Sequence, residues 1–183
     1  GAIVNLHPKK CDVKILRAIA PLSSRLFHLT IAIAPTKSMD RFEWFLEKAT
    51  EIGCDEIVPI SCRHSERTVI KTGRLNKILV SAMKQCLKSQ FPVLHEMIDF
   101  KTFIDNAGRD LSERSPSERS RPTKQKFIAH IPELSESEFP PQNPQGKLLS
   151  KSINPSLGSQ IVIAIGPEGG FSADEVSVSE KAG

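Results

Sequence analysis

The segment from Gln160 to Val176 constrains the fold more than any other part of this sequence. Its first residues, Gln160–Ile165, are mostly branched and apolar, which is typical of a strand buried on both faces of a parallel sheet. A Gly-Pro-Glu-Gly-Gly turn follows at Gly166–Gly170. Beyond it, Ser172 and Glu175 form a capping-box signature, which predicts the start of a helix. A strand, a glycine-rich turn and a capped helix in this order predict a place to bind a ligand.

Upstream of this segment, short apolar runs alternate with helical periodicity. The predicted strands span residues 56–60, 93–97 and 127–131, and the predicted helices span residues 40–53, 74–90 and 99–107. The first helix is expected to be capped by Asp40 with Glu43 and to stop at Gly53. Pro59 lacks an amide hydrogen, so its strand is expected at a sheet edge or to end there. The alternation predicts an α/β layer structure with a mostly parallel sheet and flanking helices.

Residues 1–34 contain only strand-like segments, at residues 2–4, 12–16 and 27–34. A freestanding hairpin is marginally stable in water, so this region is expected to be the remainder of a larger β module. The predicted boundary therefore separates residues 1–34 from a main domain at 35–183. Two long polar stretches, at residues 108–126 and 132–159, interrupt the main domain, and the first of them is expected to be a mobile surface excursion.

Composition limits the classes of protein that this chain can belong to. Its 183 residues are 39% hydrophobic, which allows one substantial core, and the formal net charge of +4 permits a nucleic-acid partner without requiring one. The four cysteines form no C-x-x-C pair and have no histidine at zinc-ligand spacing, so no metal site is predicted. The apolar runs are too short to cross a bilayer, and a soluble, intracellular protein with reduced thiols is expected.

Two groups of residues could carry chemistry. The turn at Gly166–Gly170 fits neither the Walker nor the dinucleotide spacing, so it is either a ligand-binding turn whose amides hold an adenosine or phosphate group, or a tight turn without a ligand. The segment Arg63–Arg67 is rich in side chains that suit phosphate and base contacts, but it could equally be a solvated loop with internal salt bridges. Lys77, Lys84 and Lys88 form a basic stripe on the second predicted helix.

Several motifs occur together in a specific order. Lys48-Ala-Thr-Glu-Ile-Gly53 is followed by Ser65-Glu-Arg67 and by the Gly166–Gly170 turn. In this order they resemble the RsmE-type methyltransferases, which are SPOUT-class, trefoil-knot enzymes that methylate N3 of a uridine in 16S ribosomal RNA. The likeness covers roughly residues 35–176, with the two polar stretches as its divergent parts.

The resemblance implies a fold, a cofactor and partners. Residues 1–34 would be part of a PUA-like, RNA-binding β-barrel, and residues 35–183 would be the SPOUT domain of a cytoplasmic homodimer that uses S-adenosylmethionine and acts on ribosomal RNA in the small subunit. The implied cofactor-binding residues are His130, Ile131, Ile165, Gly166, Pro167, Glu168, Gly169 and Gly170. The implied RNA-binding residues are Arg63, Ser65, Glu66, Arg67, Gln85 and Lys88.

The sequence also departs from the family pattern. An arginine-bearing stretch usually stands where this chain has Lys88–Pro92, and the family continues past the glycine turn with segments that complete the knot and the adenine pocket. The chain is therefore expected to be truncated at both ends. The implied reaction needs a group that removes the N3 proton, and the candidates are Glu168, Glu66 and His64. Two other functions stay open: an RNA-binding module without catalysis, and a nucleotide-binding α/β enzyme that uses the glycine turn for phosphate.

Overall fold

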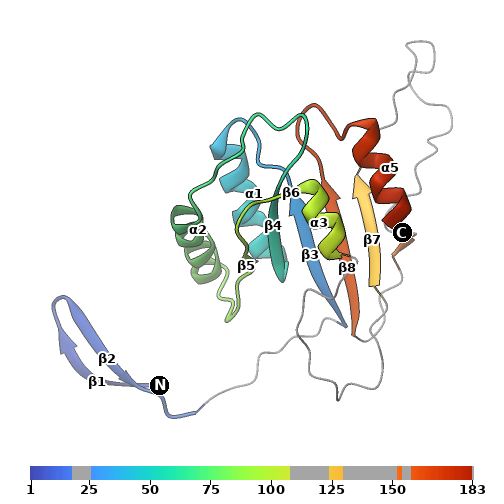
Figure 1. Cartoon of the computed structure of the whole chain (residues 1–183). Coiled ribbons are helices and arrows are strands. Elements are labelled where there is room, and N and C mark those ends of the chain that lie inside the picture. Colours follow the sequence, from blue (N-terminus) through green and yellow to red (C-terminus); the bar gives the residue numbers. More distant parts are fainter. Residues whose placement is uncertain (18–25, 108–123, 130–151, 154–157, 183) are drawn as a thin grey trace, which may run out of the picture.

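A computed structural model describes residues 1–17, 26–107, 124–129, 152–153 and 158–182. The strands are β1 (Ala2–His7), β2 (Lys10–Lys14), β3 (Phe27–Ile33), β4 (Glu56–Ser61), β5 (Val93–Leu94), β6 (Ile98–Asp99), β7 (Lys124–Ala129) and β8 (Ser159–Ile165). The helices are α1 (Met39–Ile52), α2 (Thr72–Gln85), α3 (Phe100–Ala107) and α5 (Ala173–Ala182). Figure 1 shows them around one sheet, with the β1–β2 hairpin as a separate pair of strands.

The main sheet has the strand order β5-β4-β3-β8-β7, and β6 adds a second short pairing to β4. Every pairing in this sheet is parallel. β8 lies between β3 and β7, which explains why its residues are apolar without alternation. The predicted class, an α/β structure with a mostly parallel sheet and flanking helices, is confirmed.

β3 belongs to the main sheet. Its residues pair in parallel with β4 on one side and with β8 on the other, from Phe27 opposite Ser159 to Ile33 opposite Ile165. The predicted boundary after residue 34 placed this strand with the N-terminal module, and that assignment is wrong. The strand pattern alone could not reveal its partners, because those partners follow it by more than 20 and more than 120 residues.

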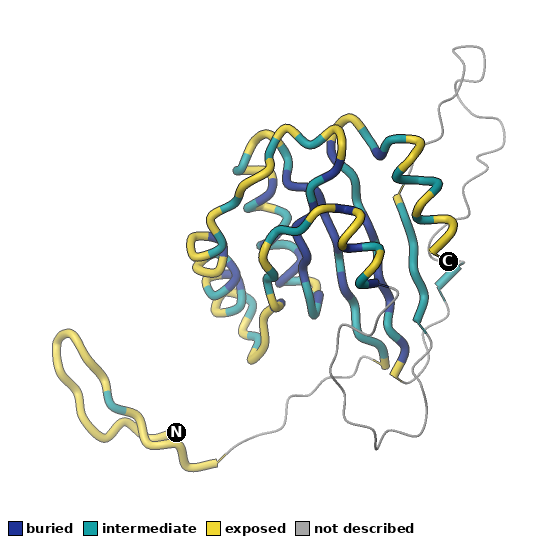
Figure 2. The backbone as a smooth tube through the Cα atoms, in the orientation of Figure 1, coloured by how far each residue is buried: buried dark blue, intermediate teal, exposed yellow. Residues whose placement is uncertain are grey.

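Helices cover both faces of the sheet (Figure 2). Alternate strand residues divide the core, since successive side chains point to opposite faces. On one face, Ile33 and Ile57 pack with Phe42, Leu46 and Leu79 of α1 and α2. The core of the other face contains small strand residues and two aromatic residues of α3: Ala32, Ala34, Val58, Ile60, Val162, Ala164, Phe100 and Phe103.

The first predicted helix is confirmed with changes at both ends. Ser38 occupies the N-cap position in an extended conformation, whereas Asp40, which was predicted to cap the helix, lies within its first turn. Gly53 ends the helix with a left-handed φ of 106°, as expected. Ile52 is 79% exposed despite its apolar side chain, and near this end of the helix Thr50 is buried, with its hydroxyl donating to the Leu46 carbonyl.

Three other element boundaries differ from the predicted ones. α2 ends at Gln85 instead of residue 90, because Leu87 has a positive φ of 55° that a helix cannot continue through. Of the predicted strand at 93–97 only β5, at Val93–Leu94, is a strand. A second short strand, β6, follows at Ile98–Asp99, where the helix was predicted to begin, and the two strands pair with opposite halves of β4. β7 begins at Lys124, within the stretch expected to be a surface excursion, while residues 108–123 lie outside the described residues.

Pro59 explains the gap between β5 and β6. The Asp55 and Ile57 carbonyls accept hydrogen bonds from the amides of Val93 and His95. The backbone groups of odd-numbered residues in β4 therefore point toward β5 and the segment that follows it. The nitrogen of Pro59 points the same way and has no hydrogen to donate. The outer ladder is accordingly interrupted at Pro59 and resumes at Ile60, while the opposite side of β4 pairs continuously with β3.

Candidate functional site

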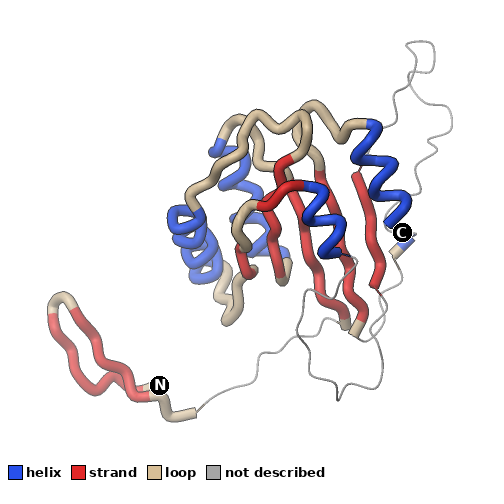
Figure 3. The backbone as a smooth tube through the Cα atoms, in the orientation of Figure 1, coloured by secondary structure: helices blue, strands red, loops and turns tan. Residues whose placement is uncertain are grey.

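Three loops meet at the carboxyl ends of β3, β4 and β8, where the loops lie together at one end of the sheet (Figure 3). We name them the β3 loop (34–38), the β4 loop (62–71) and the glycine turn (166–170). Parallel neighbours place their carboxyl ends at the same edge, where open α/β sheets bind ligands. A hydrogen bond of 2.9 Å from the Ala34 amide to the Ile165 carbonyl joins the β3 loop to the strand that precedes the glycine turn.

The glycine turn is a tight backbone turn. The Gly170 amide donates to the Pro167 carbonyl at 2.9 Å, and Gly170 has a positive φ of 72°. A side chain on Gly166 would meet the ring of Phe171 at 3.0 Å, so the backbone lies directly against this buried ring. The amides of Glu168 and Gly169 have no acceptor among the described residues. They are donors that a ligand could use.

His64 of the β4 loop lies against this turn. Its Nδ1 is 3.2 Å from the Gly169 carbonyl oxygen. A Cβ added to Gly169 would stand 3.1 Å from the Cβ of His64, so the absence of a side chain at Gly169 is what allows the approach. The two segments are 105 residues apart in the sequence, and this contact joins the candidate cofactor turn to the candidate RNA loop.

Lys37 connects the β3 loop to both of the others. Its amide donates to Oε1 of Glu168 at 3.1 Å, and its Nζ is 2.9 Å from Oε2 of Glu66. The hydrogen bond with Glu66, together with the charge of that carboxylate, raises the pKa of Lys37. Two of the three residues considered as proton acceptors therefore already bind Lys37.

Arg67 has a structural role in this arrangement. Its guanidinium donates to the carbonyl oxygens of Lys37 at 2.7 Å and of Thr36 at 3.4 Å. Arg67 thus holds the β3 loop against the β4 loop. This contact is compatible with the predicted RNA role but gives the side chain a second function that the sequence did not indicate.

Glu175 connects the β4 loop to the start of α5. Its Oε2 accepts the Ser172 amide at 2.8 Å and the Ser172 hydroxyl at 3.0 Å, while the Glu175 amide lies 3.4 Å from Oγ of Ser172. The predicted capping box is confirmed. Oε1 accepts the Arg63 amide at 2.8 Å, and the Arg63 guanidinium is 3.6 Å from Asp174. The sequence predicted the cap but not the hydrogen bond between Arg63 and Glu175, because these residues are 112 positions apart. We call this hydrogen bond the bridge.

Ser65 and Cys62 shape the beginning of the β4 loop. The Ser65 hydroxyl accepts the Cys62 amide at 2.9 Å, and the Ser65 amide donates to the Cys62 carbonyl at 3.0 Å. Burial, with the nearby negative charge of Glu175, raises the pKa of the Cys62 thiol to about 12. Cys62 is therefore a protonated core residue, and Ser65 has its hydroxyl turned into the loop.

Gln85 and Lys88 do not join the other predicted RNA-binding residues. α1 leaves the carboxyl end of β3 and returns to the amino end of β4, so its last turn lies at the opposite edge of the sheet. The Lys88 amine donates to the carbonyls of Thr50 and Glu51 in that last turn. Gln85 lines a groove between α1 and α2. In a single chain Lys88 therefore lies away from the Arg63–Arg67 segment, and the RNA-binding role that the resemblance implies for Gln85 and Lys88 stays a prediction.

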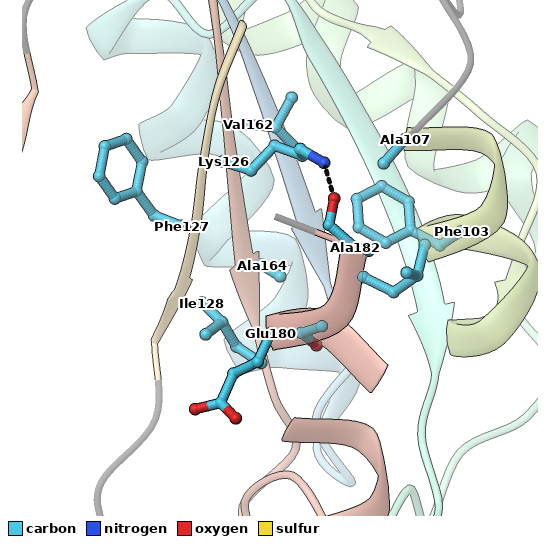
Figure 4. Close-up of a pocket in the computed structure, with 11 residues that line it drawn as sticks. Phe103, Ala107, Lys126, Phe127, Ile128, Val162, Ala164, Glu180 and Ala182 are labelled. Atoms are coloured by element: carbon cyan, nitrogen blue, oxygen red, sulfur yellow. Dashed lines mark hydrogen bonds between the residues drawn. The ribbon is translucent and has the colours of Figure 1, made fainter. Parts of the chain in front are cut away.

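A mostly apolar cavity of about 200 Å³ lies between α3, α5 and the β7–β8 part of the sheet. Figure 4 shows Phe103 and Ala107 of α3 facing Val162 and Ala164 across it, and Lys126 donates to the Ala182 carbonyl at its border. None of the five glycine-turn residues lines it. His130 and Ile131, the other predicted cofactor-binding residues, lie outside the described residues.

The residues present fit part of a cofactor site. The glycine turn offers the amides of Glu168 and Gly169, and a Cβ added to Gly170 would meet nothing within 4 Å, so the backbone there is open to a ligand. Within the described residues, no three His, Cys, Asp or Glu side chains are grouped as a metal site would need, and no helix combines the length and apolar character needed to span a bilayer.

Comparisons with known proteins agree with this arrangement. The chain is 34% identical to a probable rRNA-methyltransferase from Porphyromonas gingivalis, with a TM-score of 0.72 over 99% of this chain and 66% of that one. Its fold is similar to a ribosomal RNA small subunit methyltransferase E from Neisseria gonorrhoeae bound to S-adenosyl methionine, with 22% identity and a TM-score of 0.59 over 85% of this chain and 55% of that one.

Curated relatives cover most of the chain. It is 26% identical over 160 residues to the ribosomal RNA small subunit methyltransferase E of Mesomycoplasma hyopneumoniae (strain 232), an alignment that covers 85% of this chain and 57% of the relative. The corresponding protein of Rickettsia conorii is 23% identical over 150 residues, which covers 82% of this chain and 51% of the relative. The chain thus spans about half the length of these relatives.

The family assignment rests on a broader match. The RNA methyltransferase domain matches residues 23–183, which is most of the chain and includes β3, in agreement with the strand pairing. The chain therefore belongs to the RNA methyltransferase domain family.

Proposed function

We propose that this chain is part of an S-adenosylmethionine-dependent methyltransferase that modifies N3 of a uridine in small-subunit ribosomal RNA. The observation that carries the proposal is the meeting of the glycine turn with the β4 loop, through His64 on Gly169 and Glu175 on Arg63. These are the segments that carry the family resemblance in the sequence. Relatives named as small-subunit rRNA methyltransferases support the substrate class.

In this proposal the two sides of the site bind different partners. The glycine turn, with Ile165 before it, binds the cofactor through the amides of Glu168 and Gly169, and the cofactor supplies the methyl group. The family likeness assigns His130 and Ile131, which lie outside the described residues, to the same cofactor-binding group. Arg63 and Lys37 have strongly exposed side chains and face the RNA, where cations contact phosphate. Ser65, Glu66 and Arg67 order the loop that presents them.

The remaining parts of the proposal follow from the family likeness. The protein acts as a homodimer in the cytoplasm, and its C-terminal region forms the SPOUT trefoil knot. The β1–β2 hairpin is part of a PUA-like barrel that helps to hold RNA. Exposed apolar side chains on the hairpin support this, because Ile3, Leu6 and Val13 would otherwise stay in water.

Calorimetric titration tests the cofactor. S-adenosylmethionine and ATP are titrated separately into the full-length protein, and heat is expected with the first alone. Heat with ATP alone would support a nucleotide-binding enzyme, and heat with neither would support an RNA-binding module. Transfer of a labelled methyl group to small-subunit rRNA, with digestion to locate the product at uridine N3, tests the reaction.

The division between the two sides has its own test. Arg63→Ala is expected to weaken RNA binding several-fold and to leave the affinity for S-adenosylmethionine within about twofold, since the Arg63 amide keeps its bond to Glu175. Lys84→Ala removes the same charge at the other edge of the sheet and serves as the matched control. An equal loss of both affinities in Arg63→Ala would contradict the division.

A further inference from the structure

The contact between His64 and the glycine turn fixes the tautomer of the imidazole. A carbonyl oxygen can only accept a hydrogen bond, so the nitrogen 3.2 Å from the Gly169 oxygen, Nδ1, must carry the hydrogen. In the neutral ring the other nitrogen, Nε2, then holds a lone pair. His64 is exposed, and Nε2 is the ring nitrogen that this contact leaves available as a proton acceptor.

Packing orients the same ring. A Cβ on residue 169 would stand 3.1 Å from the Cβ of His64, so a residue other than glycine there would push the histidine back by a few tenths of an ångström. A hydrogen bond at Nδ1 and a backbone surface beneath the ring position the imidazole beside the turn that binds the cofactor in our proposal. This arrangement follows the general pattern in which a partner at one nitrogen orients a histidine base.

The two carboxylates are less suitable. Glu66 is in an ion pair with Lys37, and one oxygen of Glu168 accepts the Lys37 amide. A general base accepts the proton through a lone pair that no other partner occupies, and histidine is the side chain most often used in this role. Glu168 keeps a second oxygen without a hydrogen bond among the described residues, but the charge of Lys37 acts on this carboxylate. His64 has a vacant ring nitrogen and no ion pair among the described residues.

We propose that His64 is a catalytic residue that accepts the N3 proton of the target uridine through Nε2. This inference rests on the proposed function and adds the identity of the base. In the step, the N3–H bond breaks and the proton moves to Nε2. The electron pair left on N3 forms the bond to the methyl carbon, and the carbon–sulfur bond breaks with its electrons returning to sulfur. The imidazolium afterwards loses its proton to water.

The first test uses His64→Ala and His64→Gln in the full-length protein. Both variants are expected to lower kcat by about 10²–10⁴-fold, the range that general-base catalysis supplies, and to leave the Kd for S-adenosylmethionine within about twofold. Thr68→Ala, an exposed change in the same loop, is the control and should retain kcat. Circular dichroism confirms folding. A kcat within threefold of wild type in either folded His64 variant would overturn the proposal.

A second test separates catalysis from loop structure. RNA that carries 5-fluorouridine at the target has a more acidic N3–H and depends less on a base, so it should restore the rate of His64→Ala at least tenfold more than it raises the wild-type rate. A variant that is slow only because its loop is disordered would show no such rescue, and that result would overturn the proposal.

A third measurement does not depend on activity. The ¹⁵N chemical shifts of the ring nitrogens in the free protein should identify His64 as the Nδ1–H tautomer, and Gly169→Ala should change that signal. The opposite tautomer would overturn the inference without touching the proposed function. Failure of the wild-type protein to methylate rRNA would instead refute the proposed function on which the inference rests.

Discussion

At the residue scale, the carboxylate of Glu175 accepts hydrogen bonds from two separate segments of the chain. One oxygen completes the capping box of α5, and the other fixes the amide of Arg63 in the β4 loop. Both bonds involve backbone amides, whose loss in a partly buried place leaves donors unsatisfied. The residue therefore links the stability of the helix to the geometry of the candidate site.

We expect Glu175→Ala to lower the free energy of unfolding by about 1–2 kcal/mol, because it removes the cap and the bridge together. Glu175→Gln should lower the free energy of unfolding by about half as much, because the single amide oxygen of glutamine can accept from either Ser172 or Arg63 but not from both. Urea denaturation measures both. Glu180→Ala, which changes an exposed carboxylate of the same helix, is the control. Equal stability of Glu175→Ala and Glu180→Ala would show that the bridge contributes nothing.

At the element scale, Lys88, which follows α2, caps the C-terminal end of α1. The last carbonyls of α1 have no partner within the helix, and the Lys88 amine supplies hydrogen bonds to Thr50 and Glu51. Leu87 is 93% exposed in a left-handed conformation, and this turn brings Lys88 back toward α1. The stretch that departs from the family pattern therefore has a structural use in this chain.

Lys88→Ala should lower the free energy of unfolding by about 1 kcal/mol and should leave RNA affinity unchanged in the single chain. Thermal unfolding measures the change in stability, and filter binding measures the affinity for RNA. Lys84→Ala removes an equal charge without removing a cap, so it should change neither the stability nor the RNA affinity. A loss of RNA affinity specific to Lys88→Ala would restore the RNA-binding role that the family resemblance implied.

Another cluster joins three strands at the amino end of the sheet. Glu56 of β4 contacts His95, which follows β5, at 3.1 Å and His28 of β3 at 3.4 Å. The hydrogen bond from His95, with the charge of His28, lowers the pKa of Glu56. A carboxyl group whose pKa is lower in the folded than in the unfolded state stabilises the fold at pH values above its unfolded pKa. This stabilisation is lost as the pH falls through the folded pKa.

We therefore expect wild-type stability to decline as the pH drops below about 4, with a contribution from Glu56 of less than about 1 kcal/mol because its partners are half exposed. Glu56→Gln should remove that contribution at neutral pH and flatten the acid part of the profile. Urea midpoints measured from neutral to acid pH give the comparison. Parallel profiles for the two proteins would show that Glu56 does not take part.

At the scale of the whole molecule, the rate at which each buried thiol is labelled measures how often the surrounding structure unfolds. Cys54 and Cys62 are buried on opposite faces of the sheet, and Cys11 is exposed. A thiol whose pKa is raised to about 12 is almost entirely protonated at pH 8, and the thiolate is the reactive form. With iodoacetamide at pH 8, we expect rapid labelling of Cys11 and labelling of Cys62 only at the rate of global unfolding.

Mass spectrometry of the labelled protein provides the check. Equal protection of Cys54 and Cys62 would show that both faces of the sheet open in one step. Rapid labelling of Cys62 with Cys54 still protected would contradict this expectation and would locate an opening near the candidate site.

Features that depend on neighbouring residues could be predicted from the sequence. The buried strand at Gln160–Ile165, the glycine turn, the Ser172–Glu175 cap and the stop at Gly53 follow from local hydrophobicity, backbone freedom and short-range hydrogen bonds. The order of these segments was also sufficient to suggest the family. Each of these features involves residues within a few positions of one another, so the sequence pattern is a direct record of the interaction.

The contacts between distant segments could not be predicted from the sequence and follow from the fold. The position of β3 in the main sheet, the use of Lys88 on α1, the two bonds of Arg67 and the contact of His64 with Gly169 all join residues separated by 30 or more positions. Parallel strands need long crossovers, and the length of a crossover does not specify which strand lies next in the sheet. The tautomer of His64 is decided by a carbonyl 105 residues away, which no local pattern encodes.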